Sequence, residues 1–400
     1  MRFAERIQRV KPSATLTINA KAGELRAQGK DVVSLAAGEP DFAPPAWVSE
    51  AAKQAIDSGF NGYTPVAGIP GLLEAVADYF CTFSKVSATK EMVVVTNGGK
   101  QGLYNLLQIL LDPEDEVLVP VPYWVSYPDM VTLAEGRPVL VPTTPEKNFL
   151  LEVEDLEAAL SPRSKVLIVN SPSNPTGSHY PQAQLDAILE WALSKGLFVI
   201  SDEIYDQLVY APAQPASAAP WLERSEGKIA VVNGLSKSFA LTGWRIGYVL
   251  SHPGVIKNLI KIQGQSTSNI CSIAQKAALA ALTGSFDFLE GARSQYARRR
   301  DLVLEIIRSW PGAVCPKPDG AFYLFPKLDA FYTREIPDST ALCSYLLESC
   351  GVALVPGAAF GDDRCLRFSY ALAEETLLQA VNKVGQALAK LEVSPKVEEA

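Results

Sequence analysis

The chain has 400 residues, of which 48% are hydrophobic and 20% charged, which is enough for a substantial core and suggests two or three domains. Its net charge of −8 argues against a nucleic-acid-binding face, because the only basic run is Arg298, Arg299 and Arg300, which we expect on a solvated helix face. No apolar run approaches the roughly 20 residues needed to cross a bilayer, and the charged N-terminus lacks a signal-peptide core.

The cysteine and histidine content narrows the possible chemistry. The six cysteines form no CxxC pair, and the chain has only two histidines, His179 and His252. We therefore predict no metal site and no histidine-based catalytic triad. A chain with neither a leader nor a disulfide pattern is expected in the cytoplasm, with reduced thiols.

Strand and helix patterns alternate through the middle of the chain. Apolar runs predict strands at residues 92–96, 117–119, 138–141, 166–169, 197–201, 229–232 and 245–250. Helical patterns separate most of these runs, which indicates an α/β fold with a mostly parallel, seven-stranded sheet.

A second pattern follows towards the C-terminus. A helical stretch at 286–309 precedes predicted strands at 321–325, 352–355 and 366–369 and a helix at 374–391, which indicates a smaller α+β domain. We predict an N-terminal arm and part of the small domain at 1–45, a large domain at 46–285 and a small domain at 286–400. The polar tail 393–400 is expected to fray.

Three polar clusters follow predicted strands directly. Asn174 follows the strand at 166–169, Asp202 and Tyr205 follow 197–201, and Lys237 follows 229–232 in a turn of small residues, eight positions before Arg245. Ligands of open α/β sheets bind at the carboxyl ends of strands. A lysine there can form a Schiff base with a carbonyl cofactor, and an arginine can grip a phosphate through two hydrogen bonds.

Each cluster alone has a simpler interpretation. Lys237 could be an exposed loop lysine, and Asp202 could cap a helix that begins near Ile204. Asn174 lies in Asn-Pro-Thr-Gly, which is a natural turn sequence. A turn and a binding site can coincide, so the combination of the three clusters matters more than any one of them.

Together these motifs resemble the class I aminotransferases of pyridoxal-phosphate fold type I, over about residues 6–391, and most closely the bacterial aspartate and aspartate–prephenate branch. The resemblance implies an enzyme with pyridoxal 5′-phosphate as cofactor and amino acids and 2-oxo acids as substrates. Lys237 would hold the cofactor and act as base and acid. Asp202 would keep the ring nitrogen protonated, and Tyr205 and Asn174 would hydrogen-bond the phenolate oxygen.

The cofactor's phosphate needs hydrogen-bond donors, and a predicted helix start supplies them. Gly98, Gly99 and Lys100 open a helix after the strand at 92–96, where free N–H groups can bind an anion, and Arg245 would add its fork. Many relatives have a serine at the position of Gly234, so Ser236 or backbone donors would replace it. Trp124 resembles the aromatic residue that stacks on the cofactor ring and borders the substrate, although an aromatic residue here could also belong to the core.

The resemblance also implies substrate contacts. Arg367 resembles the arginine that binds the α-carboxylate through two hydrogen bonds. A guanidinium in an otherwise apolar strand is costly unless it is paired, and the alternative is a structural ion pair. Gly38 resembles the segment whose backbone approaches that carboxylate, beside Asn174. Tyr63 resembles the tyrosine that reaches the phosphate of a neighbouring subunit, which implies a homodimer with shared active sites.

A second recognition site would select the amino acid. Residues 263–269 lack the arginine of animal-type aspartate aminotransferases, whereas Lys100 and Thr15 resemble the lysine and threonine of the bacterial branch. Lys11 matches an arm lysine that supports prephenate use. Lys100 could instead be a surface lysine, and Lys11 could face water.

We therefore expect L-aspartate and 2-oxoglutarate to give oxaloacetate and L-glutamate by a ping-pong mechanism, with prephenate to arogenate as a second reaction. The alternatives are a lyase, an aromatic aminotransferase or an alanine aminotransferase of the same fold. A non-catalytic cofactor-binding regulator is the alternative from another class.

Overall fold

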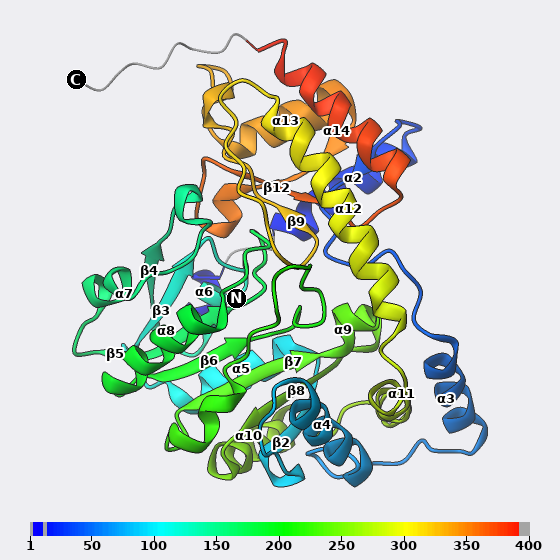
Figure 1. The fold of residues 1–400 in the computed structure, drawn as a ribbon, viewed down its shortest axis with the longest axis vertical. Coiled ribbons are helices and arrows are strands. Elements are labelled where there is room, and N and C mark those ends of the chain that lie inside the picture. The colour runs from blue at the N-terminus through cyan, green and yellow to red at the C-terminus, as the bar shows by residue number, and fades with distance from the viewer. Residues whose placement is uncertain (1–2, 11–13, 392–400) are drawn as a thin grey trace.

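The computed structural model describes residues 3–10 and 14–391, and its centre is a seven-stranded sheet (Figure 1). The strand order is β2-β8-β7-β6-β5-β3-β4, and β8 runs antiparallel to both of its neighbours while the other pairs are parallel. The strands are β2 Val93–Asn97, β3 Glu116–Val121, β4 Arg137–Pro142, β5 Ser164–Asn170, β6 Phe198–Asp202, β7 Ile229–Gly234 and β8 Ile246–Ser251. The predicted α/β fold with a mostly parallel, seven-stranded sheet is confirmed.

Helices cover both faces of this sheet, which explains why its strands are continuous apolar runs. Val93 and Val95 of β2 pack on one face with α4, α8 and α11, while Val94 packs on the other with α5, α6 and α10. The helices are α3 Ala46–Asp57, α4 Pro70–Phe83, α5 Gly99–Leu110, α6 Tyr127–Leu133, α7 Val153–Ala159, α8 Gln182–Ser194, α9 Leu235–Ser238, α10 Pro253–Ser266 and α11 Ser272–Thr283. Two faces packed in this way fix the strand ends, where the predicted polar clusters lie.

The remaining elements form a smaller layer above the carboxyl ends of the central strands (Figure 1). They are α2 Ala14–Ala27, β1 Val33–Ser34, α12 Phe288–Arg308, β9 Tyr323–Leu324, α13 Ser339–Cys350, β10 Val352–Ala353, β11 Val355–Pro356, β12 Leu366–Ser369 and α14 Glu374–Leu388. The exception is α1 Glu5–Gln8, which lies against α6 beside the central sheet (Figure 1). β1 pairs with β10 in parallel, and β11, β12 and β9 form an antiparallel sheet. Short 3-10 turns cover Lys90–Met92, Pro145–Lys147, Ala219–Arg224, Thr242–Trp244, Asp329–Phe331 and Gly357–Phe360.

Two of the strands predicted in this layer differ from those observed. The strand expected at 321–325 begins only at Tyr323, because Ala321 has φ +55°, outside the extended region. The run expected at 352–355 is divided at Leu354, since β10 pairs with β1 whereas β11 pairs with β12. The boundaries at 45/46 and 285/286 stay a prediction, and the tail 393–400 lies outside the described residues.

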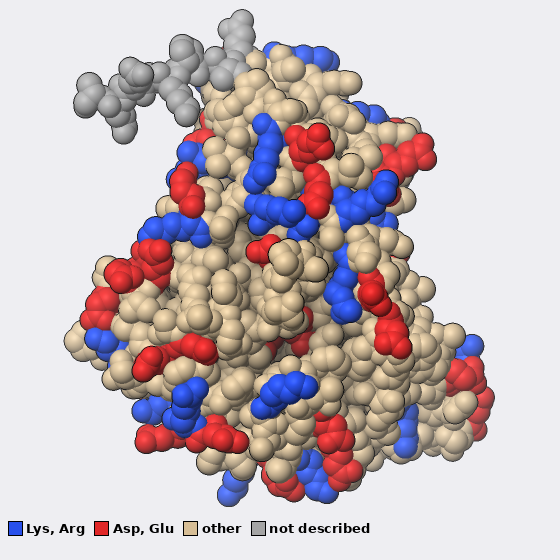
Figure 2. Space-filling view, in the orientation of Figure 1, with Lys and Arg blue, Asp and Glu red and all other residues tan. Residues whose placement is uncertain are grey.

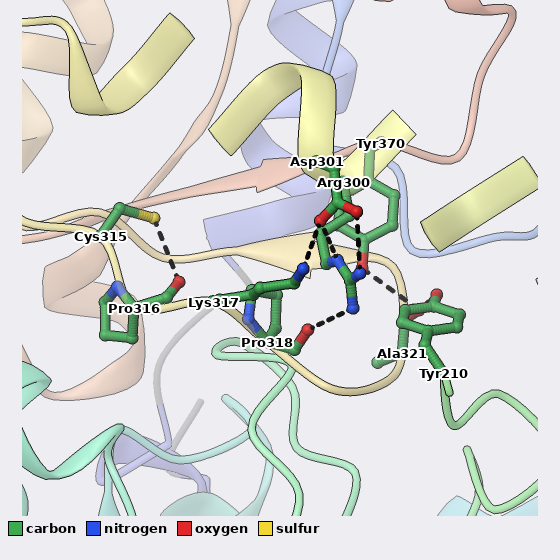
Figure 3. Close-up of polar contacts among 9 residues, drawn as sticks. All are labelled: Tyr210, Arg300, Asp301, Cys315, Pro316, Lys317, Pro318, Ala321 and Tyr370. Carbon is green, nitrogen blue, oxygen red and sulfur yellow. Dashed lines mark hydrogen bonds and ion pairs between the residues drawn. The ribbon is translucent and has the colours of Figure 1, made fainter. Parts of the chain in front are cut away.

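The prediction of a solvated face for the three consecutive arginines of α12 is wrong for two of them. Arg298 is exposed and pairs with Glu374, whereas Arg299 and Arg300 are 8% and 3% exposed. Arg300 donates to Asp301 at 2.9 Å and to the carbonyl oxygen of Pro318 at 2.9 Å (Figure 3). Successive helical residues point about 100° apart, so one run cannot face solvent throughout.

The surface charges and the helix lengths bear on the possible binding of nucleic acid and membranes. On the face drawn in Figure 2, acidic and basic side chains are interspersed. Within residues 3–10 and 14–391, no helix has both the length and the apolar character needed to span a bilayer.

Candidate active site

A cavity of about 670 Å³ lies at the carboxyl ends of the parallel strands, where the smaller layer meets the sheet. It collects residues from distant parts of the chain, and most of the predicted site residues line it: Gly38, Gly99, Lys100, Trp124, Asn174, Asp202, Tyr205, Ser236, Lys237, Arg245 and Arg367. The sequence prediction that these residues share one site agrees with this placement.

Lys237 lies on α9, a single helical turn after β7, where the sequence predicted a turn of small residues. Its Nζ donates to the carbonyl oxygen of Gly38 at 2.5 Å. Burial lowers the pKa of Lys237 to about 8, against the opposing charge of Glu39. A lysine with a lowered pKa is partly neutral near physiological pH, which makes it a usable nucleophile and base.

The close approach of β7 and β8 explains the glycine at position 234. A Cβ atom there would lie 2.6 Å from the carbonyl oxygen of Ile246, which leaves no room for a side chain. Ser236, 7% exposed, is the neighbouring hydroxyl that does line the cavity. A donor role for Ser236 in place of a residue at 234 stays a prediction.

Asp202 ends β6 and is 5% exposed. Its Oδ2 accepts from the hydroxyl of Tyr127 at 2.7 Å, and its Oδ1 accepts from the backbone N–H of Ile204 at 3.3 Å. Burial raises the pKa of Asp202 to about 6, and the Tyr127 hydrogen bond limits that rise. The local capping contact and the placement in the cavity therefore coexist.

Tyr127 was not predicted as a site residue. It lies three positions after Trp124 in the same segment that follows β3, and the two rings meet edge-to-face at 5.4 Å. Its position three residues after Trp124 is the feature of the sequence that could have predicted Tyr127 as a site residue.

Tyr205 forms a pair with a second tyrosine that the sequence analysis missed. The hydroxyls of Tyr205 and Tyr323 are 2.9 Å apart, and Tyr323 comes from β9 in the smaller layer. Burial raises the pKa of Tyr205 well above its usual range, so its phenol stays protonated and able to donate. No local pattern marks Tyr323, because its role depends on packing between segments 118 residues apart.

Arg367 is 2% exposed and projects from β12 into the cavity. Its Nη1 donates to Oδ1 of Asn174 and its Nη2 to the carbonyl oxygen of Ala36, both at 2.8 Å, while its Nε has no partner. No carboxylate pairs with it in the part of the chain that the structure describes. A buried guanidinium without an anion is costly, so the site is built for an anionic ligand, and the alternative of a structural ion pair has no support.

The start of α5 forms the other end of the cavity. Gly98 has φ +79°, and a Cβ there would lie 2.3 Å from Nη2 of Arg245. Arg245 donates from Nη1 to the carbonyl oxygen of Thr242 at 2.8 Å. Lys100 Nζ lies 4.8 Å from the Trp124 ring centre, and burial with the charge of Arg245 lowers the pKa of Lys100. Two cations beside the free N–H groups of a helix start favour an anion.

Comparison with known proteins agrees with this geometry, since residues 30–384 match the family model described as aminotransferase class I and II. The chain belongs to the class I and II aminotransferase family. The aminotransferase is 45% identical over 392 residues to the aspartate/prephenate aminotransferase of Cereibacter sphaeroides, which covers 96% of this chain and 97% of the relative. It is also 45% identical over 393 residues to the enzyme of that name from Thermus thermophilus, which covers 97% of this chain and 99% of the relative.

Solved structures give the same result for the fold. The Thermus thermophilus aspartate aminotransferase with maleate has a TM-score of 0.91 at 44% identity and covers 97% of this aminotransferase and 100% of the other chain. The aspartate aminotransferase of Rhizobium meliloti has a TM-score of 0.94 at 38% identity, with coverages of 98% and 100%. The predicted family, fold and enzyme class are confirmed.

Two predicted site residues, Gly98 and Tyr63, are not among the residues that line the cavity of this aminotransferase chain. Gly98 directly precedes the lining residue Gly99, whereas Tyr63 is 95% exposed. Thr15 belongs to α2, but its side chain is not among those described, and Lys11 lies outside the described residues. Their roles stay predictions.

Proposed function

We propose that the cavity binds pyridoxal 5′-phosphate and that the chain is an aspartate aminotransferase, which converts L-aspartate and 2-oxoglutarate into oxaloacetate and L-glutamate. The observation that carries this proposal is the buried Arg367, which lines the same cavity as Lys237, the lysine of lowered pKa. Among the described residues no carboxylate pairs with Arg367, and its Nε has no hydrogen-bond partner. Relatives named aspartate aminotransferase or aspartate/prephenate aminotransferase, 40–46% identical over nearly the whole chain, support it.

The residues present fit this cofactor at each of its polar groups. The α5 start with Gly99, Arg245 and Ser236 would hold the phosphate, and Asp202 would pair with the ring nitrogen. Trp124 would contact the ring. Gly98 supports the fit, because its missing side chain leaves the space that Arg245 occupies at the helix start. When bound, the cofactor supplies an electron sink for the charge that develops at the substrate α-carbon.

The side chains themselves have separable tasks in this proposal. Nζ of Lys237 would anchor the cofactor and, once released, take up and return the proton of the substrate α-carbon. Asp202, with a pKa of about 6, is charged at neutral pH and would keep a proton on the ring nitrogen. Tyr205 and Asn174 would donate to the phenolate oxygen, and Tyr323 and Arg367 hold these two side chains in place.

The substrate would be bound through its two carboxylates. Arg367 would take the α-carboxylate in a forked contact, beside the backbone of Gly38. Lys100, with Thr15, would take the second carboxylate, since Lys100 is the cation that remains among the described residues of the cavity lining after Arg367, Lys237 and the proposed phosphate arginine. The structure solved with maleate, a dicarboxylate, belongs to a relative with the same fold, which supports a dicarboxylate substrate here.

The assembly we propose is a homodimer with shared active sites. The exposed Tyr63 is outside the cavity of its own chain and would reach the phosphate bound by the partner. Lys100 and Arg245 also border a second cavity of about 880 Å³, so the phosphate end opens towards the surface on which a partner could lie.

We propose prephenate as a second oxo acid substrate, with Lys11 as the residue that supports its use. The support is that the relatives from Cereibacter sphaeroides and Thermus thermophilus are named aspartate/prephenate aminotransferases. Prephenate carries a carboxylate on its oxo acid arm and another on its ring, so Arg367 and Lys100 could bind its two ends.

One assay panel tests these proposals. The purified, cofactor-loaded protein is given aspartate, glutamate, alanine or phenylalanine with several oxo acids, and prephenate is offered with aspartate or glutamate as donor. Oxaloacetate formation that requires an oxo acid acceptor supports the proposal. A preference for alanine or phenylalanine would indicate the alternative aminotransferases. Product that exceeds the amount of cofactor without an acceptor would indicate a lyase, and cofactor binding without turnover would indicate a regulator.

A further inference from the structure

The segment of residues 36–42, which we call the strap, crosses the active-site cavity between two fixed ends. On its N-terminal side, β1 pairs with β10, and the N–H of Ser369 donates to the carbonyl oxygen of Leu35 at 2.8 Å. On its C-terminal side, the Phe42 ring packs against Tyr296 and Phe288 of α12, with ring centres 6.2 and 6.4 Å apart. Figure 1 shows the dark-blue chain running beside α12 on its way to α3.

The middle of the strap contacts two cationic side chains of the cavity, Arg367 and Lys237. The carbonyl oxygen of Ala36 accepts from Nη2 of Arg367 at 2.8 Å, and that of Gly38 accepts from Nζ of Lys237 at 2.5 Å. Glu39 lines the cavity next to them. The position of the strap backbone therefore sets the orientation of both side chains.

The end of the strap is held by a polar cluster on α12. Nη1 of Arg299 donates to both carboxylate oxygens of Asp41, at 3.0 and 2.8 Å. The Tyr296 hydroxyl donates to Oδ1 of Asp41 at 3.0 Å, and the Asp41 N–H donates back to that hydroxyl at 3.3 Å. The side chains of Arg299 and Asp41 are only 10% and 26% exposed, so solvent screens this pair less than a surface pair.

We propose that Arg299, acting through Asp41, is a positioning residue for the binding of the substrate carboxylate. It fixes the strap so that the carbonyl groups of Ala36 and Gly38 hold Arg367 and Lys237 in their observed places. This inference rests on the proposed role of Arg367 in carboxylate binding. The pair itself does not line the cavity, so its effect is indirect.

The expected consequence is a change in binding more than in chemistry. If the strap is released, Nη2 of Arg367 loses its carbonyl partner and the guanidinium can tilt away from the forked geometry. Because the amino acid and the oxo acid both carry an α-carboxylate, both KM values rise. A tie that only stabilises the fold would lower the melting temperature and leave the KM values unchanged.

The chain offers a matched control in the preceding residue of the same helix. Arg298 pairs with Glu374 at the surface, and its side chain is 70% exposed. We would compare Arg299→Ala and Asp41→Asn with Arg298→Ala. The first two variants are expected to raise both KM values by about tenfold, which corresponds to the loss of one polar contact, and to change kcat less. Arg298→Ala is expected to match wild type.

A second measurement needs neither turnover nor cofactor. In the cofactor-free protein, hydrogen exchange of peptides that cover residues 36–42 should be faster in Arg299→Ala and Asp41→Asn than in Arg298→Ala. The double variant should be no worse than the more affected single variant, because the two residues act as one pair.

These measurements separate the possible failures. The inference would be overturned if Arg299→Ala had the KM values and the hydrogen exchange of wild type. It would also be overturned if a lowered melting temperature were the only effect of this substitution. If Arg299→Ala does not fold, the milder Asp41→Asn carries the same test. If the wild type does not transaminate dicarboxylates, the proposed function fails, whereas exchange in the cofactor-free protein still decides whether the pair holds the strap.

Discussion

Replacement of Arg367 by lysine tests the proposed carboxylate site, because it keeps the charge and removes the fork. In the structure, Nη1 and Nη2 of Arg367 each hold one partner at 2.8 Å, and Nε is unpaired. A lysine ammonium cannot bond Asn174, Ala36 and both oxygens of a substrate carboxylate in the same plane. Loss of one or two charge-assisted hydrogen bonds costs about 2–4 kcal/mol, so kcat/KM should fall by about 30- to 1000-fold.

The assay is the steady-state rate for aspartate and for 2-oxoglutarate, each varied separately. Both kcat/KM values should fall, since both substrates carry an α-carboxylate, while the absorbance of bound cofactor should stay close to that of wild type. Arg364→Lys is the matched control, because Arg364 pairs with Asp362 at 2.8 Å and does not line the cavity. One charge-assisted hydrogen bond is worth about 1.5–3 kcal/mol. A fall in kcat/KM of less than about fivefold, or a fall for only one of the two substrates, would therefore refute the assignment.

Three further predictions concern the amine, the assembly and the substrate range. In the cofactor-free protein, burial disfavours the charged form of Lys237, so its acylation rate should rise with pH through a midpoint of about 8 and not near 10.5, the ordinary value; peptide mass spectrometry measures this, and a midpoint near 10.5 would contradict it. Inactive Lys237→Ala subunits mixed with Tyr63→Phe subunits of low activity should regain activity, because a hybrid dimer has one intact site; no recovery after verified subunit exchange would place Tyr63 in its own subunit's site. Lys11→Ala should lose arogenate formation selectively while it keeps the aspartate reaction, and equal activity on prephenate would rule out the proposed role of Lys11.

The sequence predicted best those site residues and strands that short local segments determine. Asp202 is the last residue of β6, and Asn174 and Lys237 lie shortly after the ends of β5 and β7. The common edge of a parallel sheet brings such strand ends together. The strands themselves were predictable because burial on both faces demands unbroken apolar runs such as the one in β5.

What could not be predicted depends on contacts between segments far apart in the chain. Tyr323 reaches Tyr205 because the β9 segment packs against the residues that follow β6, and Arg299 reaches Asp41 across 258 residues. The run of three arginines suggested a solvated face, since charge is usually exposed, but the two layers bury Arg299 and Arg300 against specific acceptors. The split of residues 352–355 into two strands has the same origin, because β1 and β12 compete for neighbouring residues of that run.

Side-by-side assay of wild type and Lys237→Ala, both supplied with pyridoxal 5′-phosphate, tests the central claim most directly. The measurement is oxaloacetate formed from aspartate, with and without 2-oxoglutarate. We predict that wild type forms oxaloacetate and glutamate continuously and in equal amounts when 2-oxoglutarate is present, that without it oxaloacetate does not exceed the amount of cofactor, and that folded Lys237→Ala shows no sustained turnover. Normal turnover by Lys237→Ala, or no oxaloacetate from cofactor-loaded wild type, would contradict the proposed aspartate aminotransferase centred on Lys237.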